Sequence, residues 1–231
     1  FSEFPSSNLT GIIQRVTYPV LCEIQNDDAR LASIYRRSLK LSAFIIFPLM
    51  VGLSSVAKPF VNIVLGQQWS FCGQLLQILC FGMMWYPIHS VNLNLLQVKG
   101  RSDLFLKLEI IKKILGISVL CITAPFGLIV MCYGQIFNSL VALAINTYYA
   151  GKLINVGFIR QMCDLLPTIA LCLVMFALIL TVNSFITGDV IKLCAGIVIG
   201  VAFYALSSRV LHFSELNEIT SLFIKGKKVK W

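Results

Sequence analysis

The sequence predicts an all-α polytopic membrane protein, and two observations carry that prediction. The chain has 231 residues, of which 58% are hydrophobic and only 13% are charged, with a mean hydropathy of +0.84. Soluble domains have about a quarter of their residues charged. The second observation is that residues 75–98 contain no Asp, Glu, Lys or Arg and are long enough to cross a bilayer as a helix. The basic loop that follows them is typical of a helix that ends on the cytoplasmic side.

The remaining elements follow in chain order. Residues 1–24 are expected to be the tail of a truncated membrane helix, because the chain opens at Phe1 with a mid-protein sequence. Residues 25–40 are predicted to form a charged cytoplasmic loop, in which Asp27 and Asp28 begin or cap a short helix. Residues 212–231 form a basic cytoplasmic tail. Between the loop and the tail, residues 41–211 hold six complete spans in helical hairpins: 41–57, 75–98, 104–124, 128–150, 165–187 and 190–211.

The basic residues predict the topology of these spans. If successive loops alternate between the two sides, 16 of the 19 Lys and Arg residues lie on one side. Lys58 and Lys192 are the exceptions on the other side, and Arg15 lies within the partial helix. Basic residues concentrate on the cytoplasmic side of membrane proteins, so the C-terminus is predicted to be cytoplasmic. The same clustering between apolar runs argues against nucleic-acid binding, despite a net charge of +9.

Polar residues at membrane depth are the candidate functional features. Those at helical spacing are Gln77, Trp85, His89 and Asn92 on the 75–98 helix, and Gln135, Asn138 and Asn146 on the 128–150 helix. Two interpretations stay open: the stripes pack against each other through interhelical hydrogen bonds, or they line an aqueous cavity that binds the hydroxyls and ring faces of sugars. His89 is also a candidate for proton coupling.

Arg15 in the partial helix has two interpretations as well. An interfacial arginine reaches toward the lipid head groups, whereas a buried arginine lines a cavity and suits a phosphate. The sequence contains no nucleophile–base pair, phosphate loop, metal-ligand spacing or carboxylate dyad. We therefore predict no enzyme activity, no catalytic or metal-binding residues and no cofactor.

Three stretches carry a family resemblance. They are Pro48–Leu49 with Gly52, Lys58–Pro59 and LGQQW; then YPIHSVNLNLLQVKGRSDLFLKLEIIKK; and then GKLINVGFIRQMCDLLP. These stretches resemble the oligosaccharide flippases of the multidrug/oligosaccharidyl-lipid/polysaccharide exporter superfamily. Within it, the chain is most similar to the lipopolysaccharide and exopolysaccharide translocases of bacterial inner membranes, and it would cover their C-terminal half.

The resemblance implies two helical lobes around a central cavity that opens alternately to each side. Such proteins translocate an undecaprenyl-diphosphate-linked oligosaccharide for O-antigen, lipopolysaccharide or exopolysaccharide synthesis, and coupling to a proton or sodium gradient is expected. Residues 1–231 would form the C-terminal lobe, with the N-terminal lobe of the same protein, membrane lipids and a polysaccharide polymerase as implied partners. Arg15 is expected to meet the diphosphate.

Three alternatives remain open. A multidrug or cation exporter of the same superfamily would place carboxylates in mid-membrane, and we expect no internal Asp or Glu within any span. A membrane-embedded glycan-processing enzyme would need a polar cluster on the non-cytoplasmic side, where Asp189 is the only acidic residue. A purely structural membrane subunit is the third alternative.

Overall fold

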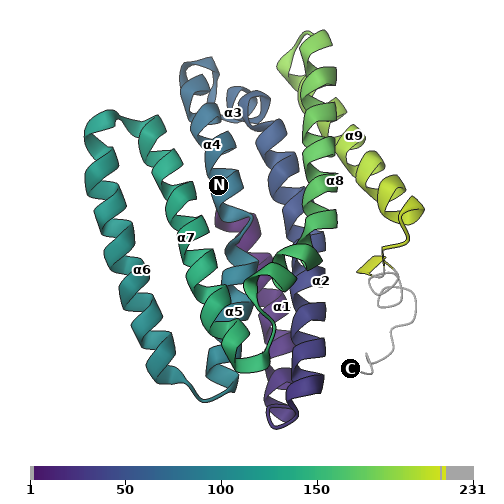
Figure 1. Ribbon diagram of the computed structural model, residues 1–231. Coiled ribbons are helices and arrows are strands. Elements are labelled where there is room, and N and C mark those ends of the chain that lie inside the picture. Colours follow the sequence, from purple (N-terminus) through teal and green to yellow (C-terminus); the bar gives the residue numbers. More distant parts are fainter. Residues whose placement is uncertain (1–2, 214, 217–231) are drawn as a thin grey trace.

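The computed structural model describes residues 3–213 and 215–216, and every regular element within them is a helix (Figure 1). The elements in order are α1 (Glu3–Glu23), α2 (Asp28–Ser55), α3 (Ala57–Leu65), η1 (Gln67–Trp69), α4 (Ser70–Met83), α5 (Tyr86–Val98), α6 (Ser102–Thr123), η2 (Ala124–Phe126), α7 (Leu128–Ile154), α8 (Phe158–Phe185) and α9 (Asp189–Val210). Short turns join neighbouring long helices into antiparallel pairs.

Five segments are long and apolar enough to cross a membrane: α2, Gln67–Val98, α7, α8 and α9. The predicted fold class, an all-α polytopic membrane protein, is therefore confirmed. The sixth predicted span is α6, whose 22 residues extend about 33 Å and match the thickness of a bilayer core. Its charged side chains make it less apolar than the other five; they are Asp103, Lys107, Glu109, Lys112 and Lys113.

The two ends of the bundle differ in charge. The α1–α2 turn, the α5–α6 loop and the α7–α8 link lie together at what we call the basic end, at the bottom of Figure 1. Helix α3, the α6–α7 turn and the α8–α9 turn lie at the far end. The helices alternate between these ends in the predicted order. Most of the predicted basic tail, residues 212–231, lies outside the described residues.

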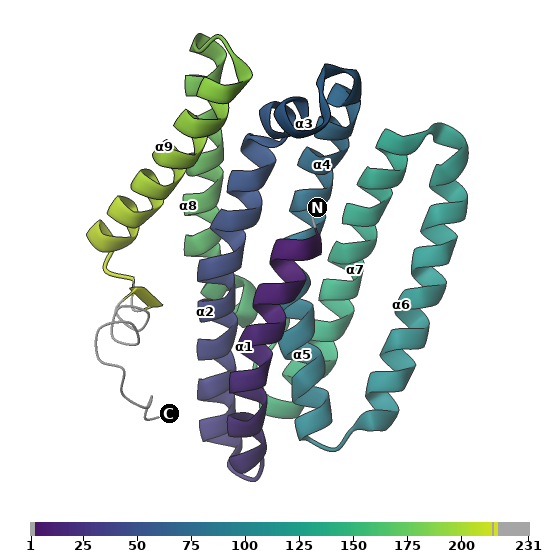
Figure 2. The same ribbon diagram turned by 180° about the vertical axis from the view of Figure 1, so that it is seen from behind.

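Helix α2 is the centre of the bundle. It contacts α1, α4, α5, α8 and α9, and its Tyr35, Phe47 and Met50 side chains are fully buried. Figure 2 shows α1, α2 and α5 in the middle, with the α6–α7 hairpin on one side and the α8–α9 hairpin on the other. The outer helices expose most of their apolar side chains, as expected for surfaces that face lipid.

The predicted loop at residues 25–40 is wrong, because α2 already begins at Asp28. Leu31, Ile34, Tyr35 and Leu39 are buried at helical spacing, so one face of this segment packs into the core while the charged side chains occupy the other. The capping role predicted for the aspartates is confirmed for Asp27, whose Oδ1 accepts a hydrogen bond from the backbone N–H of Arg30 at 3.0 Å.

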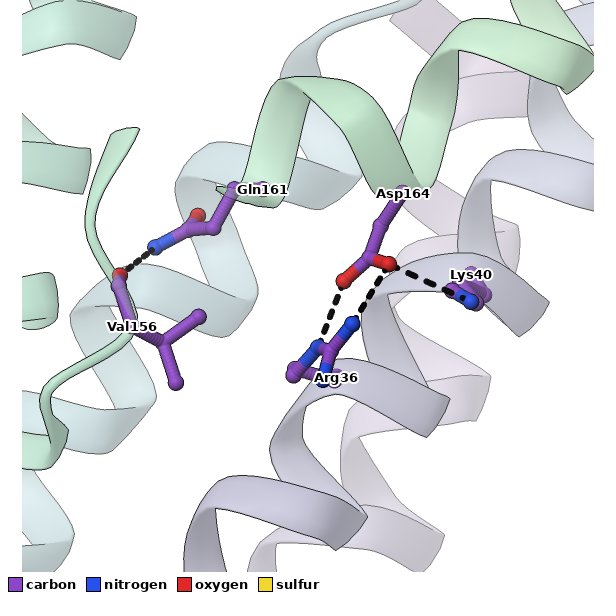
Figure 3. A network of polar contacts seen from close by, with 5 residues as sticks. All are labelled: Arg36, Lys40, Val156, Gln161 and Asp164. Atoms are coloured by element: carbon purple, nitrogen blue, oxygen red, sulfur yellow. Dashed lines mark hydrogen bonds and ion pairs between the residues drawn. The ribbon is translucent and has the colours of Figure 1, made fainter. Parts of the chain in front are cut away.

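An ion network joins α2 to α8 near the basic end (Figure 3). The Arg36 guanidinium donates to both carboxylate oxygens of Asp164, at 2.6 and 2.7 Å, and the Lys40 ammonium lies 3.3 Å from the same carboxylate. One turn earlier in α8, the buried Gln161 amide donates to the Val156 carbonyl at 3.0 Å and ties the helix to the preceding link. These contacts fix the first turns of α8 against the central helix.

Close packing of α4 against α3 depends on Gly73. A Cβ at this position would lie 2.9 Å from Lys58 Cα, which is closer than real Cβ atoms approach a backbone. We expect Gly73→Ala to lower the free energy of unfolding by about 1–3 kcal/mol, since the two helices must separate. Gly11→Ala in α1 is the control, because nothing lies within 4 Å of a Cβ there.

The control substitution should stabilise its helix by about 0.5–1 kcal/mol, because alanine has the higher helix propensity. Unfolding of both variants in detergent by heat measures the difference. Equal changes in the two melting temperatures would contradict the close α3–α4 approach.

Candidate functional site

The predicted 75–98 span is broken in the middle, between α4 and α5. Pro87 lies in the first turn of α5 and has no N–H to donate to the Met83 carbonyl four residues earlier. The Ser6 hydroxyl of α1 donates to that carbonyl instead, at 2.9 Å. The Ser139 hydroxyl of α7 donates to the neighbouring Gly82 carbonyl at 3.2 Å. Two adjacent helices therefore supply the backbone partners that a break inside a membrane requires.

The break places His89 against α7. The Asn146 amide lies 3.3 Å from His89 Nδ1, and Ser139 Oγ lies 3.3 Å from His89 Nε2. An amide N–H can only donate, so Nδ1 acts as the acceptor and Nε2 carries the proton that is donated to Ser139. Ser139 then passes its own hydrogen bond to the Gly82 carbonyl. The result is one directed chain of hydrogen bonds that runs from α7 to α5, back to α7 and on to α4.

A cavity of about 420 Å³ opens beside this chain, between α4–α5, α6 and α7, and we call it the inner pocket. Its polar lining comprises Tyr86, His89, Ser90, Glu109, Lys112, Lys113, Gln135, Asn138 and Ser139. The rise of a helix places Lys112 about 15 Å from the start of α6 and His89 about 14 Å from the end of α5, so both lie at the same depth. Glu109 and Lys112 form an ion pair, and Lys113 leaves the pocket with an excess of positive charge.

The structure brings together three of the predicted residues on the inner pocket: His89, Gln135 and Asn138. Asn146 is fully buried behind them and contacts His89. Asn92 is fully buried too, where its Oδ1 accepts a 2.7 Å hydrogen bond from the Tyr35 hydroxyl. The two stripes therefore meet at His89, and both of the predicted arrangements, packing and cavity lining, occur along them.

The other three candidates lie elsewhere. The Trp85 ring packs edge-on against Phe47, with centroids 5.3 Å apart, on the central helix. Gln77 faces two cavities near the far end. Arg15 is exposed on α1, whose Thr17 and Leu21 side chains face the bundle. Among the residues described, no group of three or more His, Cys, Asp or Glu side chains is placed to hold a metal ion.

Comparison with known proteins gives both sequence and structural matches. A family model described as polysaccharide biosynthesis protein matches residues 1–74. An uncharacterized membrane protein in the cps region of Klebsiella pneumoniae is 32% identical over 142 residues, covering 62% of this chain and 29% of that protein. The lipopolysaccharide biosynthesis protein WzxC of Escherichia coli K12 is 30% identical over 143 residues, with coverage of 62% and 28%.

The fold has a solved counterpart. The lipid II flippase MurJ, in its inward closed conformation, superimposes with a TM-score of 0.66 over 90% of this chain and 47% of that chain, at 18% identity. The chain is similar to membrane proteins of polysaccharide biosynthesis in sequence and to a flippase in fold. At this identity the likeness to MurJ shows the fold alone. The teichuronic acid biosynthesis protein TuaB of Bacillus subtilis is a further relative, 22% identical over 205 residues, with coverage of 87% and 42%.

The resemblance to membrane proteins of polysaccharide biosynthesis, on which the sequence analysis relied, is confirmed by these matches. The matched segments span less than half of the length of these curated relatives. The activity of the whole protein is therefore treated below as a proposal.

Several inner-pocket residues were missed by the sequence analysis. These are the charged residues of α6, Glu109, Lys112 and Lys113, which it did not include among the candidate functional residues. The structure pairs Glu109 with Lys112 and directs both into the pocket. It also shows that the expectation of no carboxylate within a span was wrong for Glu109. The signal was available: a helix that begins at Ser102 carries these charges two to three turns into the membrane.

Proposed function

We propose that the protein to which this chain belongs translocates an undecaprenyl-diphosphate-linked oligosaccharide across the bacterial inner membrane, by alternating access between two lobes. The chain forms the C-terminal lobe in this proposal, and its C-terminus is cytoplasmic. Relatives named for lipopolysaccharide and teichuronic acid biosynthesis support the role in polysaccharide synthesis. The fold shared with a lipid II flippase supports the movement of a lipid-linked sugar.

The inner pocket is the observation that carries the proposal. Its neutral lining groups, among them Gln135, Asn138 and Ser139, can donate to and accept from sugar hydroxyls. Helix α6 adds two lysines against one glutamate, so the pocket favours a substrate that carries negative charge. A hydrogen-bonding, cationic pocket inside a bundle of membrane helices suits an acidic or phosphorylated glycan.

A cation exporter is the second candidate, and Glu109 is the observation that favours it. However, the ion pair with Lys112 neutralises this carboxylate, and Lys113 adds a further positive charge to the same pocket. A cationic drug would meet net repulsion there. The relatives are named for biosynthesis and flipping, so we assign the chain to transport and not to catalysis of glycan chemistry.

Arg15 is proposed to contact the diphosphate of the carrier lipid. Its side chain is exposed on the face of α1 that points away from the rest of the chain. A guanidinium at this position can bind phosphate oxygens with two parallel hydrogen bonds. Arg15→Lys keeps the charge but loses this geometry, whereas Arg15→Ala removes both.

The test is restoration of surface polysaccharide in a strain that lacks its own flippase, using the full-length gene that contains this chain. The wild-type gene should restore the polysaccharide, and Arg15→Ala should reduce it by about tenfold or more, with Arg15→Lys between them. If the wild-type gene and both variants restore polysaccharide equally, the transport function is supported and Arg15 is only an interfacial anchor. Drug resistance conferred by the wild-type gene without any polysaccharide would favour the cation exporter.

A further inference from the structure

Lys58 and Lys192 are the two basic residues that break the charge asymmetry of the sequence, and the fold brings them together. Lys58 lies on α3 and Lys192 lies in the first turn of α9, both at the far end of the bundle (Figure 1). They line one cavity of about 380 Å³, which we call the far-end pocket. Such residues are uncommon on this side of a membrane protein, so their convergence in one pocket requires an explanation.

Tight backbone packing holds both lysines in place. Gly73 lets α4 approach the backbone of Lys58, as described above. Gly196, one turn after Lys192, lets α9 press against the corner between α2 and α3, where a Cβ would lie 2.4 Å from Val56 Cγ1. The Asn62 amide donates to Asp189 Oδ2 at 3.0 Å and joins α3 to the start of α9. The two elements that carry the lysines are therefore directly connected.

Two side-chain oxygens of residues that line the far-end pocket lack hydrogen-bond partners within the described residues. Asn183 is only 9% exposed, lines the pocket and has no hydrogen-bond donor for its Oδ1. The Oδ1 atom of Asn62 is buried and unpaired as well. Nearly all buried polar atoms in proteins have a partner, so these two oxygens are acceptors that a molecule with donor groups could satisfy.

The charges indicate the remaining chemistry of that molecule. Two lysines face a single carboxylate, Asp189, which leaves the pocket with a net positive charge. Neither lysine forms an ion pair in the described part of the chain. Lysine binds phosphate as a point charge, and two lysines from different helices match a phosphate with several anionic oxygens. Trp69 is exposed near this end, where aromatic residues mark the level of lipid head groups.

We propose that the far-end pocket binds a phosphate-bearing, hydroxylated head group, with Lys58 and Lys192 on the phosphate and Asn62 and Asn183 accepting from its hydroxyls. An anionic phospholipid and the diphosphate-linked sugar of a carrier lipid share this chemistry. The proposal does not rest on transport, because the site is defined by binding alone.

Native mass spectrometry of the full-length, delipidated protein in detergent tests the proposal. The probes are dioleoyl phosphatidylglycerol, a farnesyl-diphosphate-linked N-acetylglucosamine, and dioleoyl phosphatidylcholine, whose head group has no hydroxyl. Lys58→Gln and Lys192→Gln should each weaken binding of the phosphate–hydroxyl probe by about tenfold. Asp189→Asn should tighten it, because the one opposing charge is removed. Lys107→Gln, an exposed lysine of α6, is the matched control and should change nothing.

The probe that responds identifies the source of the head group. If the lysine substitutions weaken the binding of phosphatidylglycerol alone, the pocket binds membrane lipid. If they weaken the binding of the sugar diphosphate alone, it binds the carrier lipid. The proposal is overturned if the wild type binds neither probe, if both lysine variants bind as the wild type does, or if Asp189→Asn weakens binding. Lys58→Arg and Lys192→Arg keep the charge and should retain affinity, which separates loss of binding from loss of folding. Failure of polysaccharide restoration would leave this result unaffected.

Discussion

Replacing Asp164 by asparagine is expected to lower the free energy of unfolding by about 2–3 kcal/mol. The carboxylate is only 9% exposed and holds two cations of α2, Arg36 and Lys40, as Figure 3 shows. An amide of the same shape leaves both cations without their charge partner. Breaking a fully buried ion pair costs about 3–5 kcal/mol, and the smaller value expected here reflects the exposure of Arg36, which is 33%.

The Arg101–Asp103 pair provides the control for this measurement. Its guanidinium donates to both carboxylate oxygens, at 3.0 and 3.1 Å, in the same two-point geometry, but both side chains are largely exposed. Asp103→Asn should therefore change the stability by less than about 0.5 kcal/mol. Thermal unfolding of both variants in detergent gives the comparison. Losses of similar size would show that burial of Asp164 does not determine the strength of its network.

Asn138→Leu is expected to reduce surface polysaccharide by about tenfold or more, in the restoration assay described above. Asn138 lines the inner pocket from α7, opposite the face that α6 presents at Gly116. Leucine fills a similar space without a donor or acceptor, so the pocket loses one hydrogen-bonding position for a hydroxylated substrate. The reduction should appear at normal protein levels in the membrane, measured by immunoblot.

Phe137→Leu is the matched control, since Phe137 precedes Asn138 and is 61% exposed on the outer face of α7. It should restore polysaccharide as well as the wild type does. If the Asn138→Leu variant restores polysaccharide fully, the substrate does not depend on the inner pocket. Loss in both variants would point to a general requirement of α7 for folding.

Much of the fold follows from hydropathy and charge. The uncharged runs locate the long helices, and the basic residues predict how the helices alternate between the two ends. The helical character of residues 28–40 was not predicted, because the arginines dominate the composition there. The spacing of Leu31, Tyr35 and Leu39 becomes informative only once the structure shows that this face is buried among the neighbouring helices.

The candidate site was predictable only in part. Helical spacing placed His89 and Asn138 on the faces of their own helices, and these faces do meet. Spacing alone does not say which residue of one helix lies opposite which residue of another. Asn92 was therefore expected beside His89 and Asn138, whereas in the structure it forms a hydrogen bond with Tyr35. The contribution of α6 was missed for a different reason: its charges were not counted in turns from the start of the helix, and such a count places Glu109 and Lys112 two to three turns inside it.

The interruption at Pro87 has a mechanical consequence. Bending the α4–α5 segment there requires no regular backbone hydrogen bond from Pro87 to be broken, because that residue has none to give. Besides side-chain packing and the neighbouring backbone hydrogen bonds, the resistance includes the two serine contacts, and interhelical side-chain bonds in membranes contribute about 0.6 kcal/mol each on average. Thermal energy is of that order, so the segment has a compliant joint at the depth of the inner pocket. Ser6 and Ser139 lie on α1 and α7, and a tilt of either helix is transmitted to the joint directly.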